Sequence, residues 1–122
     1  MKRIFNKKIG VLIFSLVCAG LVNAAPVRNA NEAVELVEES IINHGFGGNQ
    51  GTECMKFYVD ETDDEFEIDV HSDNEKCGGD SGVEPRLFSY TVNKETGELA
   101  TDNMSYAEDQ GVDWEGDFLP ID

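Results

Sequence analysis

Three acidic side chains and a histidine recur at every second position between residues 65 and 71, where they could do chemistry together. Glu65, Glu67, Asp69 and His71 alternate with apolar residues, so in an extended strand they project from one side. Such groups could transfer protons or hold a cation, but glycosidase chemistry needs two carboxylates across a sugar-sized cleft. The pattern favours a solvated strand face, with a partner-binding face as the second interpretation and catalysis as the third.

The most specific local string is residues 77–82, which read C-G-G-D-S-G. It resembles the segment around the nucleophile of trypsin-like serine proteases, and that resemblance implies a Ser81 nucleophile served by a histidine base and a buried aspartate. The chain is too short for the two packed barrels of that family. Val83 and Glu84 also replace the glycine and proline of the family pattern. We therefore expect a turn-rich loop here and no catalytic residue.

The first 24 residues have the composition of an export signal. Four basic residues precede an apolar run from Ile9 to Val22, and Val22 and Ala24 fit the small-residue rule of a leader-peptidase site. As a helix this run is about 21 Å long, short of the roughly 30 Å of a hydrocarbon core, which disfavours a retained anchor. Val17 before Cys18 disfavours a lipoprotein. We predict a signal peptide over residues 1–24.

Removal of this leader leaves two cysteines, Cys54 and Cys77. An even pair in an oxidising compartment predicts a disulfide, and the loop that it closes makes such a bridge worth about 3 kcal/mol. A metal site is the alternative, but the chain contains no C-x-x-C or H-x-x-H spacing. We expect the disulfide and predict no metal ligands and no cofactor.

The predicted mature chain, residues 25–122, is strongly acidic. It holds all 25 acidic residues against five lysines and arginines, so its formal charge is −20, compared with −16 for the whole sequence. Nucleic acids and anionic lipid headgroups require a basic footprint, so we expect neither nucleic acid nor membrane as a partner. Basic proteins and cations are favoured. The sequence has no EF-hand loop, which leaves only weak calcium binding through clustered acidic residues.

Apolar spacing predicts one helix followed by a sheet. Between Asn31 and His44 apolar residues recur at intervals of three and four, after a capping Asn29 and before Gly45. Beyond Cys54 the period changes to two, which predicts strands. These strands cover residues 55–59, 66–70, 88–92 and, weakly, 98–102. We predict a single α+β domain: one N-terminal helix packed on an antiparallel meander of about four strands, with one disulfide.

Two segments lie outside these elements. Residues 72–85 are glycine-rich and contain Cys77, which predicts an ordered projecting loop. Arg86 follows it as one of few cations, and we expect it to pair with nearby carboxylates and hold the loop more than to serve a substrate. Residues 104–122 are acidic, yet we expect this tail to pack partly on the sheet. Its large apolar residues are Trp114, Phe118, Leu119 and Ile121.

Residues 86–101 read R-L-F-S-Y-T-V-N-K-E-T-G-E-L-A-T. This strand, turn and return strand resemble the last hairpin of PepSY-type domains, which often end in D-x-x-T-G-x-ϕ; Asn93 stands where Asp is common. With the helix and first hairpin, the resemblance covers most of residues 31–101, with 72–85 as an insertion. It implies an exported, non-catalytic α+β module, in some relatives tied to restraint of peptidases, and carries over no active-site residue. A looser likeness is to small exported immunity proteins, acidic domains that plug a toxin's active site.

Together these features predict a non-catalytic binding protein of the inhibitor or immunity type, located in the bacterial periplasm or secreted. Its partner would be a basic protein, such as a peptidase or a toxin. The alternative is a calcium- or cation-responsive envelope protein. The residues expected to bind the partner come from one strand face and the neighbouring loop: Glu65, Glu67, Asp69, His71, Asp80 and Arg86.

Overall fold

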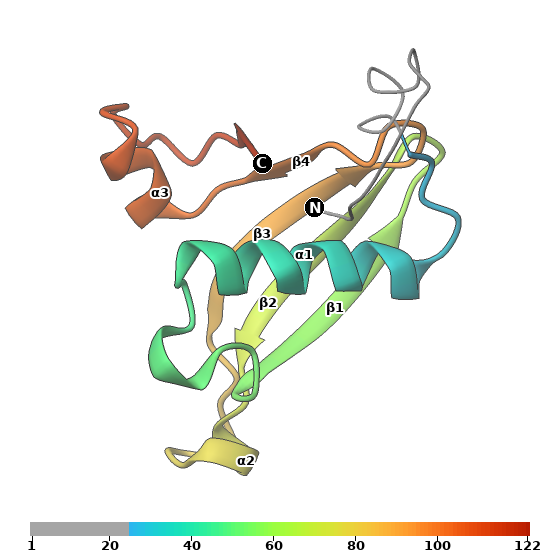
Figure 1. The fold of residues 1–122 in the computed structure, drawn as a ribbon. Coiled ribbons are helices and arrows are strands. Elements are labelled where there is room, and N and C mark those ends of the chain that lie inside the picture. The colour runs from blue at the N-terminus through green and yellow to red at the C-terminus, as the bar shows by residue number, and fades with distance from the viewer. Residues whose placement is uncertain (1–24) are drawn as a thin grey trace, which may run out of the picture.

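The computed structural model describes residues 25–122, in which one long helix lies across an antiparallel sheet (Figure 1). The signal peptide predicted for residues 1–24 lies outside the described residues. The helices are α1 (Ala30–His44), α2 (Asn74–Cys77) and α3 (Met104–Asp109), with a short 3₁₀ turn, η2 (Gly48–Gln50). The strands are β1 (Met55–Glu61), β2 (Glu65–Ser72), β3 (Arg86–Asn93), β4 (Leu99–Thr101) and β5 (Leu119–Ile121).

Helix α1 has a capping residue at each end, Asn29 and Gly45. The Asn29 side chain accepts a hydrogen bond from the Glu32 N–H at 2.9 Å, as an N-cap does. The Glu32 carboxylate accepts hydrogen bonds from the backbone N–H and the guanidinium of Arg28; in a capping box it would instead accept from the N–H of Asn29. These two hydrogen bonds, the backbone one first, lower the pKa of Glu32. At the other end Gly45 has a φ of 71°, the left-handed conformation that terminates a helix.

The sheet is a meander whose strands neighbour one another in chain order, β1-β2-β3-β4-β5. All four pairings are antiparallel. β1 pairs with β2 without interruption from Met55 opposite Ser72 to Glu61 opposite Phe66, whereas the β2–β3 register shifts between Val70 and His71. The predicted α+β fold, with its helix and antiparallel sheet, is confirmed.

The turn between β3 and β4 depends on an asparagine and a glycine. The Asn93 side chain accepts hydrogen bonds from the N–H groups of Glu95 and Thr96. Gly97 has a φ of 75°, and a Cβ there would lie 2.9 Å from the Ala25 carbonyl oxygen. Glycine therefore satisfies both the backbone conformation and the close approach of the N-terminal segment.

The fifth strand is the main difference from the prediction. Residues 104–122 form α3 and then β5, which pairs with β4 so that Ile121 lies opposite Leu99. Ile121 is buried, but Trp114 and Phe118, which we expected to supply buried surface, remain 40% and 37% exposed. A three-residue strand is too short to show alternation in the sequence. β5 forms because it pairs with β4.

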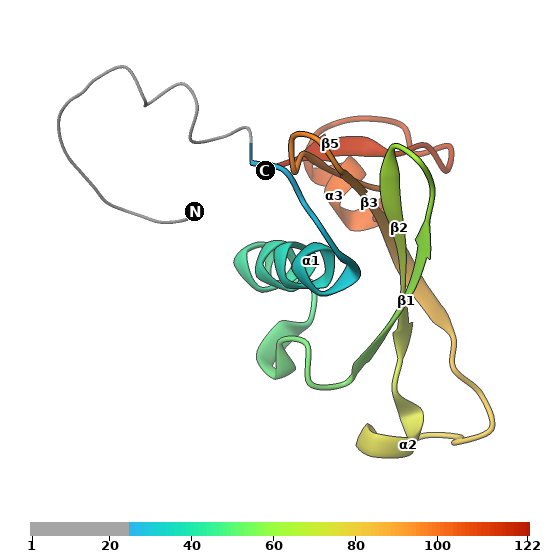
Figure 2. The ribbon, with the colours of Figure 1, turned by 90° about the vertical axis from the view of Figure 1, so that its right-hand side faces the viewer.

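The core lies between α1 and one face of the sheet. Buried side chains come from α1, from the alternate residues of the strands that point toward it, and from the N-terminal segment. They are Val27, Ala33, Val37, Ile41, Phe66, Ile68, Val70, Phe88, Tyr90, Val92, Leu99 and Ile121. Full burial of one such side chain contributes about 1.5–3 kcal/mol. The opposite face of the sheet is not covered by α1 (Figure 2).

The predicted disulfide is present and anchors the loop at one end of the sheet. Cys54 and Cys77 are bonded with their Cα atoms 5.7 Å apart. Within the loop, the Asn74 side-chain amide donates to the carbonyl groups of Asp80 and Val83. The loop is therefore ordered by the disulfide and by its own hydrogen bonds, and it extends beyond the end of the sheet around α2 (Figure 1).

Candidate functional site

The face of the sheet opposite α1, which we call the open face, is the candidate site. Side chains alternate along a strand, and Phe66, Ile68 and Val70 point into the core. The intervening residues of β2 therefore point to the open face, as the sequence predicted. They are Glu65, Glu67, Asp69 and His71.

One half of the open face is acidic. Asp60 of β1 lies directly opposite Glu67 of β2, and like charges in that position destabilise a sheet. Glu65 lies opposite Asn93, and Glu98 precedes the buried Leu99 and so shares the open face. We call Asp60, Glu65, Glu67 and Glu98 the acidic half. Within residues 25–122, none of these four carboxylates is in an ion pair.

A shallow hollow adjoins the acidic half. It has a volume of about 480 Å³, and its lining includes the acidic residues Glu65 and Glu98. Thr91 and Asn93 add a hydroxyl and an amide to its lining. Two acidic side chains beside an open depression suit a cationic group, such as a lysine or arginine side chain of another protein.

In the other half of the open face, polar side chains form hydrogen bonds with one another, and we call it the internally bonded half. Ser89 Oγ donates to Asp69 at 2.6 Å, and the Ser89 N–H donates to Asp102 at 2.7 Å. Arg86 Nη1 donates to Asp102 at 3.1 Å and to Ser89 Oγ at 3.0 Å. Arg86 thus pairs with a carboxylate as expected, but this pair connects β3 with the end of β4 and does not hold the loop.

The loop is held by Glu84. Its carboxylate accepts hydrogen bonds from Lys56 Nζ at 2.6 Å and from the Tyr58 hydroxyl. Its backbone carbonyl accepts from His71 Nδ1 at 2.7 Å. The hydrogen bond from Lys56, followed by that from Tyr58, lowers the pKa of Glu84, while the bond to Glu84 raises the pKa values of Lys56 and Tyr58. The ammonium and carboxylate are therefore both favoured in their charged forms.

The structure separates the six predicted partner-binding residues into three places. Asp69, His71 and Arg86 lie in the internally bonded half, and Glu65 and Glu67 lie in the acidic half. Asp80 lies in the loop, where its carboxylate accepts a hydrogen bond from the Gly82 N–H. The site residues that sequence reasoning did not select come from other strands and from the loop; they are Asp60, Glu84, Glu98 and Asp102.

Positive charge is largely neutralised within the molecule. In the part of the chain that the structure describes, Lys76 is the one lysine or arginine outside an ion pair. The pairs are Arg28–Glu32, Lys56–Glu84, Arg86–Asp102 and Lys94–Glu61. The surplus of carboxylates is consequently exposed to solvent without local counterions of the protein.

The residues considered for catalysis are dispersed. Ser81 is exposed in the loop. His44 Nε2 lies 2.7 Å from Asp122 Oδ1, and His71 bonds to the Glu84 carbonyl, so each imidazole is engaged with another partner. Among residues 25–122, no three His, Cys, Asp or Glu side chains gather into a group that could hold a metal ion. The calcium-binding alternative is therefore supported only by the clustering of acidic residues in the sequence.

No helix among the described residues is long and apolar enough to cross a bilayer. Comparisons with protein-family models, with characterised proteins and with solved structures find no match for this chain. The PepSY-type resemblance therefore stays a prediction. A fold alone does not define an activity, and the open face with its charges is the feature of this molecule that bears on function.

Proposed function

We propose that this chain is an exported, non-catalytic acidic binding protein of the inhibitor or immunity type, which docks its open face on a basic protein partner. The observation that carries the proposal is the acidic half, where Asp60 faces Glu67 and no cation of the described chain pairs with either. This arrangement is unfavourable in the free protein. A cationic partner surface would relieve the repulsion on binding, which supports a role in association.

The surrounding features support the same mode of docking. The hollow beside Glu65 and Glu98 suits a basic side chain of the partner, and the internally bonded half lies on the same face of the sheet. The disulfide supports a periplasmic or secreted location, where thiols are oxidised. The PepSY-type resemblance and the likeness to immunity proteins support a peptidase or a toxin as the partner.

The salt dependence of association tests the electrostatic part of the proposal. Disulfide-bonded protein, immobilised at 50 mM NaCl, would capture its partner from an envelope extract, and the purified partner would then be used in surface plasmon resonance. We expect the association rate to fall at least tenfold between 50 and 300 mM NaCl, because screening removes steering between charged surfaces. An association rate that ignores salt over this range would contradict the proposal.

Two charge-matched variants locate the docking surface. The first replaces Glu65, Glu67 and Glu98 with glutamine on the open face. The second removes the same charge from α1 and α3 with Glu39→Gln, Glu108→Gln and Asp109→Asn. At 50 mM NaCl we expect the first to slow association at least tenfold and the second at most about threefold, since steering depends on nearby charges. Equal losses would show that net charge, and not the open face, determines binding.

A further inference from the structure

The two edges of the sheet are protected very differently. β5 is three residues long and contains Pro120, and short strands and prolines are common protections of an exposed edge. β1 is seven residues long, has no proline, and pairs with β2 without a bulge. Its one basic residue, Lys56, is bonded to Glu84. In Figure 1, β1 forms the outer strand with no further strand beside it.

Backbone groups of β1 point out of this edge at known positions. Hydrogen bonds in an antiparallel ladder join every second residue pair. The β1–β2 ladder is bracketed by two such bonds, from the Asp73 N–H to the Cys54 carbonyl at 2.8 Å and from the Thr62 N–H to the Glu65 carbonyl at 2.9 Å. Even-numbered residues of β1 therefore bond to β2. The N–H and C=O groups of Phe57 and Val59 face the free edge.

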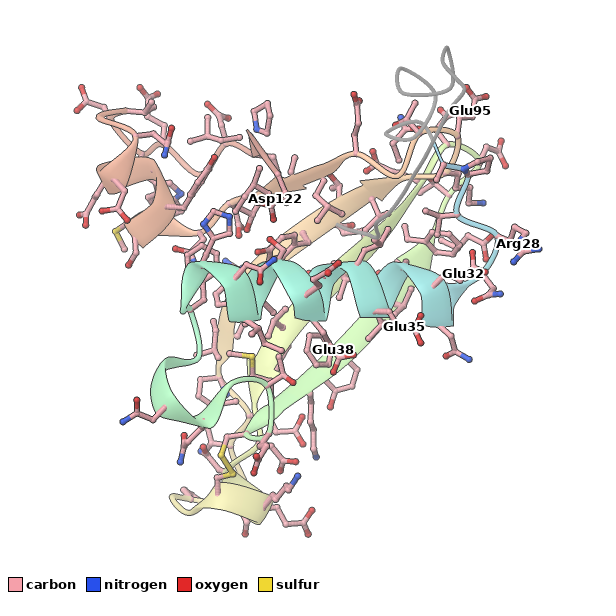
Figure 3. The ribbon with its side chains drawn as sticks, in the orientation of Figure 1. Arg28, Glu32, Glu35, Glu38, Glu95 and Asp122 are labelled. Atoms are coloured by element: carbon pink, nitrogen blue, oxygen red, sulfur yellow. A yellow bond between two sulfur atoms is a disulfide. The ribbon has the colours of Figure 1, made fainter. Side chains whose placement is uncertain are left out.

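The side chains beside this edge differ on the two faces of the sheet. On the α1 side, Phe57 and Val59 are only partly buried against the core, as is Val34 of α1. Glu38 accepts a hydrogen bond from Thr52 and so lies on the β1 side of the helix. Figure 3 shows Glu35 and Glu38 projecting from α1 on the side where β1 lies. On the open face, Asp60 is exposed next to Glu67.

We infer that the β1 edge receives an extended segment of the partner, with alternating apolar and basic residues, as a sixth strand of the sheet. The inference deepens the proposed function and rests on it. The apolar side chains of the added strand would cover Phe57 and Val59, and its basic side chains would lie beside Asp60 and the acidic half. Strand addition supplies affinity through main-chain hydrogen bonds and specificity through alternate side chains.

A second copy of this chain is the competing occupant of the edge. Two β1 strands could pair antiparallel about Tyr58, which would place Phe57 of one chain opposite Val59 of the other. Each chain carries a formal charge of −20 over residues 25–122, from 25 acidic residues against five basic ones. Repulsion of this size opposes self-pairing and favours a basic segment.

Synthetic peptides test the inference directly. The probe is a capped heptapeptide, K-V-K-V-K-V-K, and its control, K-K-K-K-V-V-V, has the same composition and charge. Binding to the disulfide-bonded protein is measured by calorimetry in 50 mM NaCl, and protection by amide hydrogen exchange. We expect the alternating peptide to bind at least tenfold tighter than the control and to slow exchange of the Phe57 and Val59 amides at least tenfold.

Backbone variants separate edge pairing from side-chain contact. Val59→Pro removes an N–H that faces the edge and leaves the ladder bonds to β2, whereas Val59→Ala trims the same side chain and keeps the N–H. We expect a loss of affinity of at least tenfold for the first and at most about threefold for the second. An N-methylated alternating peptide, which requires no change in the protein, should bind at least tenfold more weakly.

Three outcomes would overturn the inference, and they are distinguishable. If both peptides bind equally and the Phe57 and Val59 amides stay unprotected, edge pairing is wrong while docking on the open face stands. If neither peptide binds, the edge inference fails, and the failure of the open-face variants would be needed to reject the proposed function as well. If the protein alone is a dimer with those amides protected, the edge is an interface between copies of this chain.

Discussion

Tyr90 places a phenol in the middle of the core, where its hydroxyl lies 2.9 Å from Ser40 Oγ. Both residues are at most 2% exposed. Burial raises the pKa of Tyr90 strongly, because the phenolate would lose its hydration, and the hydrogen bond with Ser40 opposes this only in part. The core therefore holds a neutral, hydrogen-bonded tyrosine whose ionisation is coupled to unfolding.

This coupling predicts an alkaline loss of stability with a defined sign. The folded pKa of Tyr90 lies above the unfolded value of about 10, so its contribution is fully present below pH 10 and is lost as the pH rises further. We expect the free energy of unfolding, measured by urea denaturation, to fall more steeply from pH 9 to 11 in the wild type than in Tyr90→Phe. Lys56 and the other titrating groups are common to both proteins. Equal slopes would contradict the burial of an ionisable Tyr90.

A helix or strand could be predicted from the sequence where its own segment carries the pattern. α1 and the strands β1 to β3 carry their own periodicity, so their existence and the shared face of Glu65, Glu67 and Asp69 were predictable, whereas β4 was only weakly indicated. The pairing of Asp60 with Glu67 depends on the β1–β2 register. The role of Glu84 depends on the path of the loop, which no local pattern contains.

β5 forms because it pairs with β4, and this dependence can be tested. Ile121 is 3% exposed and lies opposite Leu99, whereas Pro120 on the same strand is exposed. We expect Ile121→Ala to lower the free energy of unfolding by about 2–5 kcal/mol through the lost burial and the cavity. Pro120→Ala should change it by less than about 0.5 kcal/mol. Equal urea midpoints for the two variants would show that β5 is not docked in solution.

The disulfide connects the start of β1 with α2, so its removal should act first on the loop. We expect Cys54→Ser with Cys77→Ser to cost about 3 kcal/mol, which corresponds to a fall in Tm of more than about 10 °C for a domain of this size. Amides of residues 72–85 should exchange before those of β2 and β3, because Cys77 anchors that loop. An unchanged Tm on reduction would show that the bridge does not contribute to stability.

The two faces of the sheet differ in what covers them and in their charge. α1 covers the apolar face and supplies the core, and it leaves the open face uncovered (Figure 2). Ion pairs take up four of the five lysines and arginines of residues 25–122. The carboxylates that remain therefore dominate the electrostatic field around the molecule.

The same unbalanced charge predicts opposite effects of salt on folding and on association. The four ion pairs are partly exposed, so each contributes at most about 1 kcal/mol and is weakened by salt. A formal charge of −20, from 25 acidic against five basic residues, repels itself in the compact state. We expect the repulsion to dominate, so that 300 mM NaCl raises the Tm above its value at 20 mM by about 4–8 °C, equivalent to about 1 kcal/mol.

Calorimetry of the wild type and of the triple glutamine variant at Glu65, Glu67 and Glu98 measures this effect. The variant should show a smaller rise in Tm with salt, because part of the repulsion is located in the acidic half. A Tm that falls with salt would mean that the ion pairs outweigh the repulsion. In that event relief of repulsion would not contribute to the proposed docking, and only the attraction between the acidic half and a basic partner would support it.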